Sequence, residues 1–509
     1  MDEMNNKVPW QAYPGEQLPP PVAAPVFPFF PTGKKELIFG ALSVICGLFL
    51  CNTVLFGGFH LGFAIALIAI IGTTMGYLLT SGCRLTGYSA TLLGLSILIA
   101  AGFARSDDGF VKFVMCCFLA VSVDLGLCLT AGQNRRKTGG ITSLLDAPRC
   151  LLVLGVGKMP PAFRGIGRTL RSGGPAMKKG GSVLLGLVIA VPVLAVLIPM
   201  LMSADAAFEG LVNLLPEFDM TEGVITLIFG ACAACLLYTR GAALRHAPKA
   251  EPVIHRAGSV SHLTVNTVLG AVCVVYVVYL FSQLAYFVGG FSGILPKEFT
   301  LAEYARRGFF EMAGLCAINL GLIALLVGIV DKKDNKSPLS TRLLCLFIGV
   351  VTLFLVATAS AKMFMYIDSY GLTRLRVLTE VIMIFLALSA AAVCLWLFLP
   401  KMPYMKVILL VGLVMGAAVL WADVDTVVAD YNVTAYQQGR LDSVDVGYLS
   451  TLGDGAIPHI ARLVNDSNPT IAKEAQAVLD RAEKLRWYDF RDWNYASWLA
   501  EEWLGIVRE

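Results

Sequence analysis

The sequence predicts an all-α integral membrane protein with about eleven transmembrane helices and a small helical domain after the last of them. Of the 509 residues, 57% are hydrophobic and only 15% are charged, whereas a soluble domain usually carries about 25% charged residues. The apolar residues also form uninterrupted runs close to the ~20 residues that a helix needs to cross the hydrocarbon of a bilayer. Because so much apolar surface cannot be hidden in one water-soluble core, we disfavour a soluble protein with buried helices.

Eleven apolar runs are candidates for membrane spans, and the third and sixth are the shortest. The expected spans are 37–56, 60–80, 85–103, 110–131, 183–202, 223–240, 262–288, 309–330, 342–361, 375–399 and 405–423.

Basic and acidic residues alternate between successive loops and predict the orientation. The loop at 132–182 carries many Lys and Arg residues against the single acid Asp146, while the next loop, 203–222, carries acids and no base. Short cytoplasmic loops are enriched in Lys and Arg. We therefore expect a cytoplasmic N-terminus and, because the number of spans is odd, an extracytoplasmic C-terminus.

Composition divides the chain into three parts. Residues 1–33 are rich in proline and are expected to form a disordered cytoplasmic tail. Residues 34–423 form the predicted membrane domain, whose basic cytoplasmic loop 132–182 is expected to dock on anionic lipid, since each Lys or Arg near such a surface contributes about 1 kcal/mol. A nucleic-acid partner is disfavoured, because no nucleic-acid-binding motif accompanies the basic residues. Residues 424–509 form the predicted extracytoplasmic domain.

The C-terminal domain is expected to contain short helices and an aromatic end. Residues 452–485 predict two amphipathic helices resembling one helical-repeat hairpin, with Pro469 in the first turn of the second. Trp and Tyr favour the membrane–water interface, so we expect the last segment to pack on the outer membrane surface or on the hairpin; a carbohydrate-stacking face is the alternative. Its aromatic residues are Trp487, Tyr488, Phe490, Trp493, Tyr495, Trp498 and Trp503.

A first polar cluster precedes the eighth expected span. Thr300 and Glu303 have the spacing of a capping box, which predicts that a helix begins there. Glu303, Arg307 and Glu311 then follow at intervals of four residues, which places them on one helical face. Asn319 lies two turns deeper.

A second polar cluster surrounds the expected turn between the ninth and tenth spans. Gly371 suits a tight turn and Thr373 can cap the helix that follows. Arg376 and Glu380 are one turn apart, with Glu380 already inside the apolar run. Ionisable residues within spans are rare and are candidates for function.

These clusters define the candidate site, which we expect in the outer half of the membrane. Arg and Glu either pair and lock spans eight to ten together, or they form a shallow pocket for an anionic small molecule or a lipid headgroup. Asp124 in the fourth span is a separate intramembrane acid, either a lone polar contact or part of an ion path. The candidate residues are Tyr304, Arg306, Arg307, Glu311, Asn319, Tyr366, Asp368, Tyr370, Arg374, Arg376 and Glu380.

The sequence contains no recognisable catalytic or metal-binding motif. Walker, HExxH and nucleophile-elbow patterns are absent, and the five histidines lack metal-ligand spacing. The thirteen cysteines are confined to expected spans and cytoplasmic segments, which argues against a disulfide framework. We therefore expect no catalytic residue, no metal and no cofactor.

Three segments resemble a bacterial family of polytopic membrane proteins. They run from Tyr304 to Glu311, from Tyr366 to Arg376, and from Asp492 to Tyr495. The family is catalogued as a domain of unknown function of the 4153/4173 type, and the resemblance extends over most of the chain after about residue 60. It implies a bacterial cytoplasmic membrane but no activity.

Three functions remain open. The number of spans, with Glu380 and Asp124, favours a permease-like or solute- and lipid-binding protein. The external domain and the basic cytoplasmic loop favour a non-catalytic envelope sensor or scaffold. The arginine-rich turn favours a membrane enzyme that acts on a lipid-linked substrate, although no catalytic motif supports this alternative.

Overall fold

A computed structural model describes residues 34–136, 141–160, 220–249, 260–291, 309–330, 338–482 and 489–504, with a few isolated positions between them. Within these ranges the chain is helical and contains no strand. Nine of the described helices are long and apolar enough to cross a membrane, and the shorter apolar helix α3 (Gly87–Gly102) stands among them. The prediction of an all-α membrane protein is confirmed.

The membrane-spanning candidates follow the predicted runs closely. They are α1 (Lys34–Phe56), α2 (Leu61–Thr80), α4 (Gly109–Thr130), α9 (Met220–His246), α10 (His262–Phe291), α12 (Phe309–Ile329), α13 (Leu339–Tyr370), α14 (Arg374–Phe398) and α15 (Tyr404–Ala422). The expected span 183–202 and the acidic loop 203–222 fall mostly outside the described residues, as do the N-terminal tail 1–33, Trp487 and Tyr488.

Large apolar side chains point outward from the helix bundle. On α10, Val274, Val278 and Phe281 are each about two-thirds exposed. Such a surface would be a large apolar patch in water, whereas in a bilayer it contacts lipid chains of equal polarity. The outward-facing residues therefore have the same physical basis as the long apolar runs.

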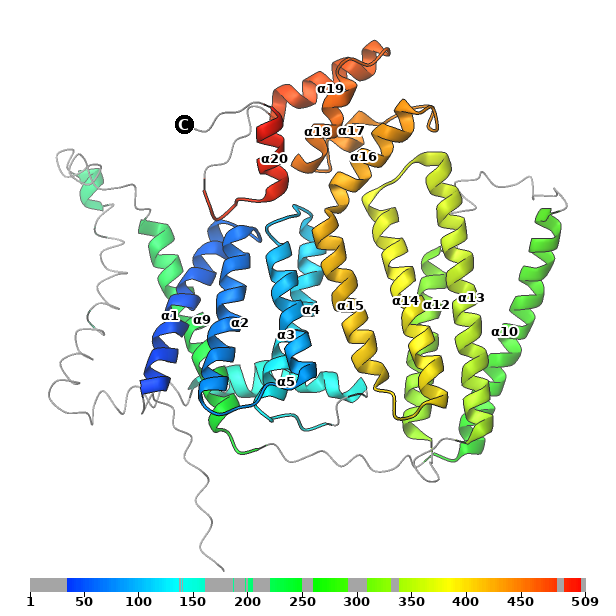
Figure 1. Cartoon of the computed structure of the whole chain (residues 1–509), viewed down its shortest axis with the longest axis horizontal. Helices are drawn as coiled ribbons and strands as arrows, with labels where there is room; N and C mark the ends of the chain where they lie inside the picture. Colours follow the sequence, from blue (N-terminus) through cyan, green and yellow to red (C-terminus); the bar gives the residue numbers. More distant parts are fainter. Residues whose placement is uncertain are drawn as a thin grey trace, which may run out of the picture.

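The membrane helices form two groups joined by α15 (Figure 1). The first group contains α1 to α4 and α9, whose buried residues form two neighbouring cores. The second group contains α10, α12, α13 and α14 around a separate core. Residues of α15 such as Leu413 and Leu420 belong to the core of the first group, while α15 also packs along α14.

The two ends of the bundle carry different structures (Figure 1). At one end lie the short helices that follow α15, which we call the C-terminal domain; α16 to α19 share a core of their own. At the other end a segment of helical turns lies across the bundle. The C-terminal elements are α16 (Val424–Gln437), α17 (Val446–Leu449), η4 (Asp454–Ala456), α18 (Ile457–Ile460), η5 (Ala461–Leu463), α19 (Pro469–Ala482) and α20 (Tyr495–Trp503); those of the crossing segment are η1 (Ile141–Leu145), α5 (Asp146–Arg149), η2 (Cys150–Gly155) and η3 (Val156–Lys158).

Helix α13 extends beyond the predicted span 342–361. Its 32 residues correspond to about 48 Å at 1.5 Å per residue, more than the ~30 Å of bilayer hydrocarbon. Tyr366, Asp368 and Tyr370 therefore lie on the last turns of a helix and not in the loop. The turn itself is short: Gly371 has φ +73°, and the side chain of Thr373 caps α14 by accepting a hydrogen bond from the Arg376 N–H, as the sequence predicts.

The C-terminal domain contacts the membrane helices at several points. The backbone N–H of Leu61 donates to the Trp493 carbonyl (3.1 Å), and that of Tyr495 donates to the Ala104 carbonyl (2.8 Å). The guanidinium of Arg105 lies 4.2 Å from the centre of the Tyr495 ring. The final aromatic segment thus packs on the ends of the first helix group.

A second point of contact is the turn between α13 and α14. The Asn432 side chain on α16 accepts from the Leu372 N–H and donates to the Leu372 carbonyl, both at 2.7 Å. A Cβ at Gly371 would approach the Asn432 side-chain oxygen to 2.6 Å. Glycine is therefore required here both for its positive φ and for the close approach of α16.

Candidate functional site: a charged junction above an apolar groove

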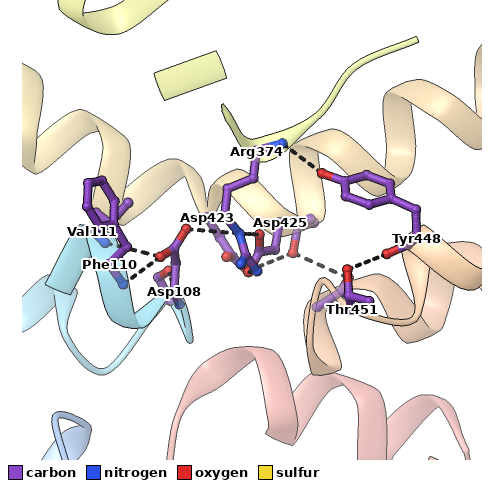
Figure 2. Close-up of polar contacts among 11 residues, drawn as sticks. Asp108, Phe110, Val111, Arg374, Asp423, Asp425, Tyr448 and Thr451 are labelled. Carbon is purple, nitrogen blue, oxygen red and sulfur yellow. Dashed lines mark hydrogen bonds and ion pairs between the residues drawn. The ribbon is translucent and has the colours of Figure 1, made fainter. Parts of the chain in front are cut away.

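Arg374 joins three elements where the C-terminal domain meets the membrane helices (Figure 2). It is the first residue of α14, and its guanidinium makes a two-pronged contact with Asp425 on α16, with Nε and Nη2 each 2.6 Å from a carboxylate oxygen. Its Nε also lies 3.0 Å from Oδ2 of Asp108, next to the first residue of α4. The Arg374 N–H donates to the Tyr448 hydroxyl at 2.8 Å. We call Asp108, Arg374, Asp425 and Tyr448 the junction cluster.

Asp108 has a second role as the N-cap of α4. Its Oδ1 accepts hydrogen bonds from the N–H groups of Phe110 (2.9 Å) and Val111 (3.1 Å). A carboxylate at this position is also stabilised by the positive end of the helix dipole. One aspartate thus starts α4 and holds the arginine that starts α14.

The break between α15 and α16 shapes the junction cluster. Asp423 has φ +53° and is the only residue other than glycine with a positive φ in the described part of the chain, a conformation that Asp tolerates better than most residues. Its Oδ2 accepts from the Thr426 hydroxyl at 2.6 Å, while its buried Oδ1 has no hydrogen-bond partner among the described residues. The bend turns α16 back over the end of α14 and brings Asp425 to Arg374.

Burial makes these carboxyl groups costly to ionise. It raises the pKa of Asp425 to about 6, although Arg374 acts in the opposite direction. Burial likewise raises the pKa of Asp423 and of Asp107. The side chains of Asp108 and Asp425 are almost fully buried, at 1% and 3% exposed, and both face Arg374, which is itself 35% exposed.

A second polar chain, with Lys112 buried and Asp107 partly exposed, adjoins the junction cluster. Lys112, fully enclosed on α4, places Nζ 3.0 Å from Nδ1 of His60, and Nε2 of His60 lies 3.8 Å from Asp107. Burial, and then the charge of Lys112, lowers the pKa of His60 to about 4. His60 therefore stays neutral at physiological pH and accepts a hydrogen bond from the lysine.

An apolar groove begins directly below the junction cluster. It has a volume of about 170 Å³ and lies between α4 and α14, with α15 behind it. Phe110 and Ile382 on its rim are more than half exposed, so the groove opens toward the surroundings of the bundle. Its lining residues are Phe110, Val111, Val114, Met115, Phe118, Leu378, Val381, Ile382, Phe385, Gly412, Met415, Gly416 and Val419.

Only some of the predicted site residues come together. Arg376 donates to the backbone carbonyls of Tyr370 and Gly371, and its guanidinium lies 4.0 Å from the centre of the Tyr366 ring. The rings of Tyr366 and Tyr370 are 5.1 Å apart. Arg374, two residues away from Arg376, points instead to the two aspartates of the junction cluster.

The other predicted residues occupy separate places. Glu380 is buried against α13, and its Oε1 has no hydrogen-bond partner among the described residues. Asp368 and Glu311 are exposed on α13 and on the first turn of α12. Tyr304, Arg306 and Arg307 lie outside the described residues, so convergence of the first and second polar clusters stays a prediction.

Asn319 links three helices of the second group. Its side chain accepts from the Tyr276 hydroxyl (2.6 Å) and donates to the Thr352 hydroxyl (3.0 Å). All of these polar atoms are buried, and hydrogen bonds between membrane helices of this kind hold neighbouring helices in register. Asn319 is accordingly a contact between α10, α12 and α13.

Asp124 is paired with an arginine from a distant part of the sequence. Its Oδ1 lies 3.0 Å from Nη1 of Arg240 on α9, and the two side chains are only 3% and 8% exposed. Of the two alternatives left open by the sequence, this geometry favours a polar contact between helices. The Nε and Nη2 atoms of Arg240 have no hydrogen-bond partner among the described residues.

The partners of Arg374 are not among the candidate residues expected from the sequence. Asp108 stands in the short loop before the fourth expected span, and Asp425 lies two residues after the last expected span, 405–423. The available signal was the presence of acidic residues close to the ends of spans. This signal does not indicate which basic residue each acid pairs with. Their pairing required the three-dimensional arrangement of α4, α14 and α16.

The helices and their buried polar contacts define the class as an all-α multi-pass membrane protein. Residues 90–463 match the family described as a domain of unknown function (DUF4153), and the chain belongs to this family. The match contains the junction cluster and the whole groove, whereas Asp492 to Tyr495 lie beyond it. No curated protein and no solved structure matches the chain.

Proposed function

We propose that the protein is a lipid-binding membrane protein that holds a hydrocarbon chain in the groove between α4 and α14. The observation that carries the proposal is the lining of the groove, which is almost entirely apolar and open at the rim. A dry apolar cavity of ~150 Å³ is known to bind small hydrocarbons, and a groove facing bilayer hydrocarbon meets lipid chains at high concentration. Such a lining suits an alkyl chain and not a hydrated ion.

The junction cluster supplies the polar end of this proposed site. Asp108 and Arg374 stand at the first turns of α4 and α14, and Phe110, Val111 and Leu378 of the groove follow within one turn. A lipid in the groove would place its headgroup beside these charges. Arg374 already faces the carboxylates of Asp108 and Asp425. The headgroup would therefore have to accept a hydrogen bond from Arg374 without displacing both carboxylates.

Filling the groove tests this function. We expect Val381→Trp, which adds bulk to the lining, to reduce the amount of lipid that co-purifies with the protein while leaving the protein folded. Ile384→Trp is the matched control, because Ile384 is on the same helix, exposed, and absent from the groove lining. Mass spectrometry of the protein purified with native lipids measures both; equal lipid retention by the two variants would contradict the proposal.

We further propose a cytoplasmic N-terminus and an extracytoplasmic C-terminal domain in a bacterial cytoplasmic membrane. In support, Lys35, Arg136 and Lys406 belong to the end of the bundle opposite the C-terminal domain, where Lys35 contacts the last turn of α2 and the turn before α15 contacts Gly139. Short loops on the cytoplasmic side of a membrane carry an excess of Lys and Arg.

Cysteine labelling tests the orientation. Ser467→Cys, at an exposed site between η5 and α19, is expected to react with a membrane-impermeant thiol reagent on intact cells. Lys401→Cys, exposed in the turn between α14 and α15, is the control and should react only after lysis. The unsubstituted protein measures the background from native cysteines. The reverse pattern would mean that the protein is inserted the other way round.

A sensor or scaffold is the second candidate function, favoured by one specific observation. The C-terminal domain contacts both helix groups at once, through Trp493 and Tyr495 at the ends of the first group and through Asp425 to Arg374 on α14. A change in the distance between the two helix groups would therefore move parts of the C-terminal domain relative to each other. Binding of a lipid in the groove between α4 and α14 would produce such a change.

A further inference from the structure

The segment at the basic end of the bundle has two apolar faces. η1, α5, η2 and η3 follow one another without interruption from Ile141 to Lys158 and lie across the ends of the membrane helices (Figure 1). One face is buried against α4 and α9 through Ala147, Cys150 and Leu154. The segment is thus part of the folded bundle.

The opposite face is apolar, and its side chains are about half exposed. Leu145, Leu152, Val153 and Val156 recur at helical spacing, and Leu152 and Val153 are 58% and 54% exposed. In water this stripe would be costly. A helical segment lying across the end of a membrane bundle meets the boundary between lipid headgroups and acyl chains, where such a stripe is buried by lipid.

Internal contacts hold the segment in this position. The buried carboxylate of Asp146 accepts from the backbone N–H groups of Arg135 and Arg136, both at 3.1 Å, and pairs with the Arg136 guanidinium at 3.3 Å. Arg149 Nη1 donates to the Gln133 carbonyl at 3.0 Å. Asp146 is therefore paired within the fold, and Arg135, Arg136, Lys137, Arg149 and Lys158 leave residues 133–158 with a net positive charge.

We propose that Ile141–Lys158 is an in-plane helical anchor that binds the lipid leaflet at the basic end of the bundle and prefers anionic headgroups. The apolar stripe contacts the acyl chains, and the net positive charge of the segment and of the residues before it favours anionic headgroups. Each Lys or Arg beside an anionic membrane surface contributes about 1 kcal/mol. This surface is at the opposite end of the molecule from the proposed groove and does not depend on it.

Photo-crosslinking tests the contact directly. The full-length protein carrying a benzophenone amino acid at Val153 is reconstituted in vesicles of phosphatidylethanolamine and phosphatidylglycerol. We expect adducts with the mass of a lipid, whereas the same probe at Leu154, which is buried one residue away, should crosslink to protein. An absence of lipid adducts at position 153, or equal lipid adducts at both positions, would overturn the anchor.

The headgroup preference has its own readout. Phosphatidylglycerol should form a larger share of the adducts at position 153 than its share of the vesicle, and Lys158→Gln should lower that share. Arg440→Gln, in the C-terminal domain at the other end of the chain, is the control and should leave it unchanged. Adducts in proportion to vesicle composition would overturn the anionic preference while leaving the lipid contact itself established.

Discussion

Replacing Arg374 with glutamine is expected to loosen the attachment of the C-terminal domain to the membrane helices. The change leaves Asp108 and Asp425 buried without their counter-charge. Removing one partner of a buried ion pair costs about 3–5 kcal/mol, and we expect the lower end because Arg374 is partly exposed. Hydrogen exchange measures the loss as faster exchange of the amides of α16 and of the Leu372 turn, since exchange reports local opening.

The neighbouring arginine provides a matched control. Arg376 bonds to two backbone carbonyls and stacks on Tyr366, and an exposed contact of this type contributes about 0.5–1 kcal/mol. Arg376→Gln should therefore leave exchange in α16 nearly unchanged. Equal effects of the two substitutions would contradict the assignment of Arg374 as the bridge.

The pH dependence of Arg374→Gln gives a readout specific to the carboxylates. Without the guanidinium, the pKa of Asp425 should rise above its present value of about 6. A carboxyl whose folded pKa is raised stabilises the fold below its unfolded pKa, and this stabilisation is lost as pH rises through the folded pKa. Exchange protection in the variant should therefore recover as the pH falls from about 8 to about 5, and adding Asp425→Asn should abolish the recovery.

The second large effect is expected at the pair formed by Asp124 and Arg240. Arg240→Met leaves Asp124 ionisable in an apolar interior, which should lower stability by about 3–5 kcal/mol. Both side chains are nearly inaccessible, so little solvent is present to replace the lost partner. Thermal unfolding of the purified protein, followed by size-exclusion chromatography, measures the change. Arg245→Met, at an exposed position on the same helix, is the control.

The double variant Asp124→Leu with Arg240→Met separates structure from transport. An apolar replacement of a buried ion pair is often neutral or stabilising, so the double variant should recover most of the stability lost in Arg240→Met. If Asp124 belonged instead to an ion path, stability would return in the double variant but any ion flux measured for the wild type would not.

Much of the membrane architecture was predictable because its cause is local. A helix of apolar residues satisfies its own backbone hydrogen bonds and needs no distant partner in lipid. Each apolar run therefore predicts a span without reference to the rest of the chain. The same holds for the turn at Gly371 and the cap at Thr373, which depend on residues within a few positions. The end of α13 was less predictable, because the helix continues past its apolar run through Tyr366, Asp368 and Tyr370, and the turn that follows is hydrogen-bonded to Asn432 on α16.

The site was predictable only in part. Arg374 and Arg376 were both candidates, and the sequence offers no reason to separate them, since they begin the same helix two residues apart. Their roles differ because a helix turns by about 100° per residue, which directs Arg374 toward α4 and α16 and Arg376 toward the end of α13. The sequence placed Glu380 and Asn319 within apolar runs as candidate site residues, but it did not indicate which helices they contact.

The sequence by itself determined that this chain is a multi-pass helical membrane protein, where most of its spans begin and end, and that its basic residues gather in alternate loops. Only the tertiary structure decided which charges meet: Arg374 pairs with Asp108 and Asp425, and Arg240 pairs with Asp124. Hydrophobic length is a property of neighbouring residues, whereas an ion pair between residues 51 to 266 positions apart depends on how whole helices pack. The groove has the same origin, because its walls combine residues of α4 with residues of α14 and α15, which lie more than 250 positions later in the sequence.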